Sequence, residues 1–92
     1  IMINQCVVVG RWTKKTKEND KMYIEIKVQR PFKNKNGEYE DDLITCLVNC
    51  NMSSTLEEYC NIGDIIGVKG HLELENNKMI VKVDKMTFLG GK

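Results

Sequence analysis

The chain has 92 residues, of which 41% are hydrophobic and 29% charged, and its formal net charge is +1 at pH 7. This length suits one domain with a single modest core, and we expect residues 1–92 to form it. The near-neutral charge excludes attraction of nucleic acid by the whole molecule, so such a partner would need a local basic patch.

No apolar run approaches the ~20 residues that span a bilayer, so we expect no membrane partner. The N-terminus lacks the basic and apolar segments of a secretion signal, which predicts a cytoplasmic protein. We interpret Ile1 as a residue added in cloning and Met2 as the natural start.

Four cysteines and one histidine are spread along the chain without the two-residue spacing that is typical of zinc motifs. Cys46 and Cys50 lie four residues apart on an expected strand, which separates them by about 13 Å and prevents a disulfide. We therefore expect buried, reduced thiols, no metal and no cofactor, with zinc as the weaker alternative.

The N-terminal segment 4–12 is rich in β-branched residues and predicts a strand that bends at Gly10. Trp12 is expected in the core rather than on a binding surface. The polar segment 14–21 follows, and we expect it to be a mobile loop.

Two further strands are predicted on either side of a cationic loop. Apolar residues occupy every second position in 23–29, which indicates a strand with one wet face, and 43–50 is a more apolar strand. Tyr23 falls on the wet face, where it either stacks on a ligand or covers a sheet edge. The loop 30–39 contains an Asn-Gly turn, and a cationic loop with exposed rings suits a phosphate chain whose bases can stack.

One short helix is expected over 53–63, because Ser54 and Glu57 have the spacing of a capping box and Gly63 can end the helix. Leu56, Tyr59 and Cys60 would share its buried face. Two strands follow, 65–74 and 78–89, joined by a turn at Asn76 and Asn77.

Five strands with a single helix between the third and fourth are the order of the all-β OB-fold, a small Greek-key barrel. Periodicity and element order leave other small barrels open.

The chain resembles the DNA-binding domain of bacterial single-stranded DNA-binding proteins over nearly its whole length. The matching segments are 3–5 and 8–11 at the start, 30–33 and 36–40 in the loop, Tyr59 with 63–64, and 68–72. The resemblance implies an OB-fold that assembles through its first strand into dimers and usually homotetramers. It also implies that single-stranded DNA wraps around the protein without sequence preference.

Site residues follow from the resemblance together with the loop pattern. Phe32 matches a position where a ring stacks on a base, and Lys33 and Lys35 match basic positions that contact phosphate. Lys69 and His71 share the polar face of the fourth strand, where a solvated face is nearly as plausible. The candidate nucleic-acid-binding residues are Arg11, Arg30, Phe32, Lys33, Lys35, Tyr39, Leu43, Lys69 and His71.

The chain also departs from the family pattern. Leu43 and Asn49 stand where the family often has aromatic rings, and the turn between the last two strands is short and lacks a ring. The family's acidic tail is not seen after Gly90-Gly91-Lys92. Because each stacked base contributes ~1–3 kcal/mol, we expect weaker binding than in better-equipped relatives.

Two functions remain open. The first is sequence-independent binding and protection of single-stranded DNA in replication, recombination and repair, by a nucleoid-associated homotetramer that also contacts replication and repair proteins. The second is a divergent OB-fold interaction module, similar to primosomal accessory proteins, that binds DNA weakly. An enzyme is not expected, because the sequence lacks paired carboxylates, a nucleophile elbow and a phosphate-binding glycine loop.

Overall fold

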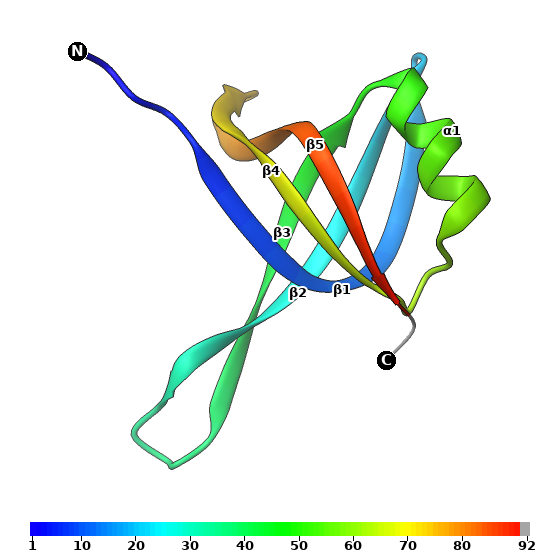
Figure 1. Ribbon diagram of the computed structural model, residues 1–92. Helices are drawn as coiled ribbons and strands as arrows, with labels where there is room; N and C mark the ends of the chain where they lie inside the picture. The colour runs from blue at the N-terminus through cyan, green and yellow to red at the C-terminus, as the bar shows by residue number, and fades with distance from the viewer. Residues whose placement is uncertain (91–92) are drawn as a thin grey trace.

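Alternating apolar side chains close the chain into a small barrel. The computed structural model describes residues 1–90, and Figure 1 shows the helix beside the barrel and one long hairpin that projects from it. The elements are β1 (Cys6–Glu18), β2 (Lys21–Lys33), β3 (Tyr39–Val48), α1 (Cys50–Tyr59), β4 (Ile65–Glu75) and β5 (Lys78–Gly90). The comparison with the family's acidic tail concerns the end of the sequence. Gly91 and Lys92 at that end lie outside the described residues.

The order of strands around the closed barrel is β1-β2-β3-β5-β4. Neighbours are antiparallel except β3 and β5, which run parallel. This order, with one helix between β3 and β4, confirms the expected OB-fold.

The barrel closes because β1 serves two partners in succession. Residues Cys6 to Arg11 pair with β4, and β1 pairs with β2 from Arg11 onward. Two glycines permit close backbone approach. A Cβ atom at Gly10 would meet the Lys27 carbonyl oxygen inside van der Waals contact, and one at Gly70 would meet the Lys82 carbonyl oxygen.

The core is lined by the inward residues of all five strands and by the helix. Ile24 and Ile26 of β2 are buried as their alternation predicted, and Trp12 is 1% exposed, which confirms its placement in the core. The indole Nε1–H of Trp12 donates to the Lys14 carbonyl oxygen at 2.9 Å, so this buried polar group is satisfied.

The polar segment 14–21 is not a loop. It forms the end of β1 and the start of β2, joined by Asn19 and Asp20 with positive φ angles of 49° and 66°. Lys15 and Lys17 reach the Glu57 carboxylate of α1 at 2.8 and 2.9 Å, and together they lower the pKa of Glu57 to about 2. The segment extends β1 because its backbone pairs with β2 from Lys14 to Glu18, which local polarity does not reveal.

The helix begins earlier than predicted, at Cys50, so the expected placement of Cys50 on a strand is wrong. Asn49, and not Ser54, is the N-cap, and its side-chain oxygen accepts from the Met52 backbone N–H at 2.9 Å. Leu56 and Cys60 are buried as predicted, whereas the Tyr59 ring is exposed and lies 6.3 Å from the Phe88 ring. All four cysteines are free, but Cys50 is exposed and Cys6 only half-buried, which corrects the expectation of buried thiols.

The β4–β5 hairpin is buried only in part. Ile66 and Val68 lie in the core, but Leu72 and Leu74 are exposed. The register between β4 and β5 shifts after Lys69, and in the part of the hairpin that follows, Val81 and Val83 of β5 stay in the core. Its turn is at Asn76 and Asn77, as predicted, with positive φ angles of 51° and 65°.

Within residues 1–90, no helix is long and apolar enough to cross a membrane. The same residues contain no group of three or more His, Cys, Asp or Glu side chains placed to hold a metal ion.

Substitution of Gly70 by Ala should destabilise the barrel, because the added methyl group meets backbone rather than a movable side chain. Overpacking of this kind costs about 1–3 kcal/mol, measurable as a lower free energy of unfolding in urea. Gly67→Ala in the same strand is the matched control, since its Cβ would lie 3.5 Å from the nearest side-chain atom. Equal stability of the two variants would contradict the account of barrel closure.

Candidate nucleic-acid interface

The outward face of β3 carries three apolar side chains that alternate with Asp41 and Thr45, and each of the three has a lysine beside it on a neighbouring strand. Residues four apart on a strand share a face, so Tyr39, Leu43 and Leu47 point the same way. We call these three side chains the β3 row. Register places Lys33 opposite Tyr39, Lys27 opposite Leu43, and Lys82 of β5 beside Leu47.

The row is open to solvent. Leu43 is 60% exposed and Tyr39 is 49% exposed, because β3 pairs with β2 alone in this part of the hairpin. The Lys33 ammonium lies 5.8 Å from the centre of the Tyr39 ring, a cation–π distance. A ring with a cation over it, and an exposed leucine about 13 Å further along the strand, offer two separate positions where a base can pack near a phosphate.

The other two lysines of the row have loose acidic partners. Lys27 Nζ lies 3.7 Å from the Asp41 carboxylate, and Lys82 Nζ lies 4.0 Å from that of Glu73. Exposed pairs of this length contribute little and are screened by salt. Both lysines can therefore exchange a carboxylate for a phosphate at small cost.

Phe32 is held out at the tip of the β2–β3 hairpin. Between Gln29 and Lys33 the register shifts, because β2 uses three residues where β3 uses only Glu40. The extra residues leave Phe32 82% exposed. The tip itself is ordered, since the Asn34 side-chain oxygen accepts backbone N–H groups from Asn36 and Glu38 at 2.9 and 3.0 Å.

Arg30 braces the opposite face of the same hairpin. Its guanidinium forms a two-pronged pair with Asp42 at 3.0 and 2.9 Å and contacts Glu40 at 3.0 Å. The hydrogen bonds from Arg30 lower the pKa of Asp42, and those carboxylates raise the pKa of Arg30. Even positions of β3 point away from the β3 row. The guanidinium charge of Arg30 is therefore paired on the opposite face of the hairpin and does not add to the charge beside the row.

Three predicted site residues lie elsewhere in the fold. Arg11 donates to the Gly63 carbonyl oxygen at 2.5 Å, on the loop that follows α1. Lys69 lies opposite Lys85 and lines a hollow with Val7 and Val9. His71 is held by two carboxylates on β4 and β5, Glu73 at 2.6 Å and Asp84 at 3.1 Å.

The structure thus brings Phe32, Lys33, Lys35, Tyr39 and Leu43 together on one hairpin. It adds three neighbours that the sequence analysis missed, which are Lys27, Leu47 and Lys82. The two-residue period of the strands relates Leu47 to Leu43 and was available in the sequence. Lys82 could not be found in this way, because its place depends on the parallel pairing of β3 with β5.

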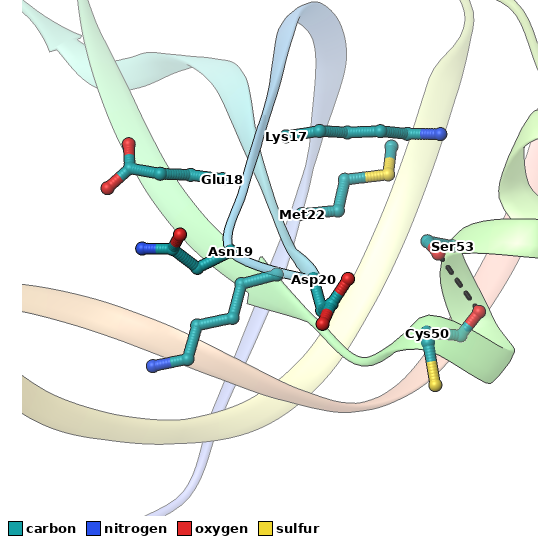
Figure 2. A pocket seen from close by; sticks show the side chains of 8 residues that line it. Lys17, Glu18, Asn19, Asp20, Met22, Cys50 and Ser53 are labelled. Carbon is teal, nitrogen blue, oxygen red and sulfur yellow. Dashed lines mark hydrogen bonds between the residues drawn. The ribbon is translucent and has the colours of Figure 1, made fainter.

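A hollow of about 610 Å³ lies between the β1–β2 turn and the start of α1 (Figure 2). Glu18 and Asp20 contribute two carboxylates to its wall against Lys17 and Lys21, and Lys17 is already paired with Glu57. This balance of charge does not favour a phosphate, so the β3 row is the better candidate for a nucleic-acid interface.

The closed barrel, its strand order and its single helix define an OB-fold protein. A mitochondrial single-stranded DNA-binding protein from S. cerevisiae has a similar structure, with a TM-score of 0.78 and 17% identity over the whole of both chains. A small single-stranded DNA-binding protein from Mycoplasma pneumoniae gives a TM-score of 0.72 with 16% identity, covering 94% of this chain and 93% of that one.

Sequence relatives define the family. Single-stranded DNA-binding protein B of Bacillus subtilis is 32% identical over 81 residues, covering 78% of this chain and 69% of that protein. Single-stranded DNA-binding protein 1 of Lactococcus lactis is 35% identical over 81 residues, covering 82% of this chain but only 54% of its own length. No family model matches. The chain belongs to the single-stranded DNA-binding protein family. It spans about half the length of most of the curated relatives that it matches.

Asp84 and Glu73 should hold His71 protonated above its ordinary pKa of 6.5, because both accept hydrogen bonds from its ring. A raised folded-state pKa stabilises the protein below pH 6.5 and loses that contribution as the pH rises through the raised value. Titration of His71 by NMR should therefore give a midpoint above 6.5, and Asp84→Asn should lower it. A wild-type midpoint at or below 6.5 would contradict this geometry.

Proposed function

We propose that this protein binds single-stranded DNA without sequence preference, with the strand running along the β3 row. The observation that carries the proposal is the lysine beside each of the three outward apolar side chains of β3. Bases pack on Tyr39, on Leu43 and on Phe32 at the tip, while Lys33, Lys27 and Lys82 neutralise phosphates. Packing on a base face does not distinguish the four bases, which accounts for sequence tolerance.

Affinity per protomer is modest under this proposal. Stacking on an aromatic ring contributes ~1–3 kcal/mol per base, and the row offers one ring, Tyr39, with Phe32 beyond it. Leu43 buries apolar area against a base but provides no π-face. Several protomers on one strand would multiply the sites and recover affinity through effective concentration.

We also propose that the chain assembles with copies of itself through β1. Val7 is 67% exposed and Val9 50%, and both line a hollow with Leu89 of β5. Within residues 1–90, the segment from Cys6 to Val9 pairs with β4 alone, so its other edge is free to pair with a second copy. In this assembly Lys69 lies at the contact between protomers rather than on the DNA path.

The cellular role that fits such a binder is the coating of single strands during replication, recombination and repair, in the cytoplasm and with other DNA-processing proteins as partners. The names of the family relatives support the DNA ligand. A docking module with weak DNA affinity is the competing function, and the balanced charge of the β2–β3 hairpin is the observation in its favour.

Leu43→Asp should weaken binding of labelled oligo(dT) at least tenfold, because it places a carboxylate among the phosphates on the row. Lys33→Ala should flatten the log–log salt dependence by about 0.7, the slope for one phosphate on a single strand. Fluorescence anisotropy at several salt concentrations measures both effects. Trp12 is buried and hydrogen-bonded, so labelled DNA is a better reporter than intrinsic tryptophan fluorescence.

Lys17→Ala provides the comparison, since Lys17 faces Glu57 of α1, away from the β3 row and from the proposed contact between protomers. An unchanged salt slope for Lys17→Ala beside a flattened one for Lys33→Ala supports the row. The docking module would be favoured instead by two results together. These are a wild-type Kd no tighter than about 10⁻⁴ to 10⁻⁶ M and a Kd that Leu43→Asp does not change.

Val7→Asp should dissociate the proposed oligomer, because it buries a carboxylate in the contact between protomers. Light scattering should then report a mass near the 10.6 kDa of one chain, against a multiple of it for the wild type. Ile62→Asp changes a similarly exposed apolar side chain outside that contact and should leave the mass unchanged. A monomeric wild type would remove the assembly from the proposal.

A further inference from the structure

We propose that Tyr23 is a further contact for the DNA strand and that Glu75 occupies, in the free protein, the place where a phosphate of the strand binds. This inference rests on the proposed function and extends the binding path beyond the β3 row. At the end of this path, the Tyr23 hydroxyl exchanges the Glu75 carboxylate for a phosphate oxygen as its hydrogen-bond acceptor.

Tyr23 lies where the β3 row ends. It points outward from β2 and stands directly opposite Leu47, the last member of the row. On the far side of Leu47 is Lys82, so a strand that follows the row brings a phosphate between these two side chains. The Tyr23 ring is only half-buried and offers a face as well as a hydroxyl.

The hydroxyl of Tyr23 is already engaged by an anion. It donates a hydrogen bond to the carboxylate of Glu75, the last residue of β4. Among residues 1–90, Tyr23 is the one hydrogen-bonding partner of that carboxylate. The β4–β5 hairpin therefore reaches over the end of the row and places a negative charge there.

The surroundings keep the hydroxyl a donor. The hydrogen bond to Glu75 raises the pKa of Tyr23, and the charge of Glu18 nearby adds to this effect. A protonated tyrosine can donate to a phosphate oxygen as well as to a carboxylate, because both are charged acceptors.

Exchange of acceptors requires only a side-chain movement. The turn at Asn76 and Asn77 fixes the backbone, with positive φ angles of 51° and 65°, but the Glu75 side chain has three rotatable bonds. A phosphate near Lys82 repels the carboxylate, which rotates toward solvent and leaves the hydroxyl to the phosphate. Because the hydrogen bond is replaced and not lost, Glu75 lowers affinity through its charge alone.

Glu75→Gln separates charge from geometry, since the amide oxygen still accepts from Tyr23. Removal of one exposed charge from the path should tighten oligo(dT) binding about two- to fivefold at low salt. Glu58→Gln removes the same charge from the exposed face of α1 and should not tighten binding. Tyr23→Phe keeps the ring and loses the donor, and should weaken binding about two- to tenfold.

Equal affinities of Glu75→Gln and Glu58→Gln, or wild-type affinity of Tyr23→Phe, would overturn the inference. If Leu43→Asp still weakens binding in that case, the β3 row stands and only its extension fails. If wild-type protein does not bind oligo(dT), both fall.

A measurement on the unmodified protein avoids any effect of substitution on folding. The carbon-13 resonance of the Glu75 carboxyl group should shift when oligo(dT) is added, because the carboxylate loses the Tyr23 hydroxyl. A resonance that stays in place at saturation would show that the contact survives binding and would overturn the exchange.

Discussion

The exchange of partners along β1 is the constraint on which the rest of the structure depends. β1 leaves β4 near Arg11 and continues with β2, and the carbonyl oxygens of Lys27 and Lys82 come so close to Gly10 and Gly70 that no side chain fits. Beyond Lys27, β2 is therefore left with β3 as its partner, and the two strands project from the barrel as a hairpin (Figure 1). The projection exposes the β3 row and the tip to solvent, so the closure of the barrel creates the surface that we propose as the site.

Charge on the hairpin is sorted by face rather than by excess. Between Lys27 and Asp42 there are four basic and four acidic residues, so the hairpin as a whole attracts neither sign. The two-residue period of the strands sends Glu40 and Asp42 to the face where they hold Arg30. The other face carries Lys33 beside Tyr39 and Lys27 paired with Asp41, so it has two lysines against one carboxylate. A protein of net charge +1 can in this way present lysines to a phosphate chain without a strong overall field.

The sequence predicted what local periodicity controls and missed what tertiary pairing controls. Alternation in β2, the order of five strands and the Asn76-Asn77 turn were correct, and they were enough for the fold. The predictions of a loop at 14–21 and of the start of α1 were wrong, because this segment pairs along β2 and Asn49 caps the helix directly after β3. For the site, Phe32 and its neighbours were visible as a cationic loop. The place of Lys82 beside Leu47 depends on the pairing of β3 with β5, which is distant in sequence. The pairing of Arg30 depends on Glu40 and Asp42 of the opposite strand.

The contact between Tyr23 and Glu75 illustrates how a binding surface can remain satisfied without its ligand. A half-buried hydroxyl at the end of the row needs an acceptor, and an unmet donor costs about 1–3 kcal/mol when water is excluded. A neutral acceptor would also satisfy the hydroxyl, but it would not repel the phosphates of an approaching strand. A carboxylate meets that need with the same charge sign as the phosphate that would replace it in the proposed exchange. In the free protein, Glu75 thus satisfies the Tyr23 hydroxyl with an anionic acceptor of the kind that the proposed ligand would supply.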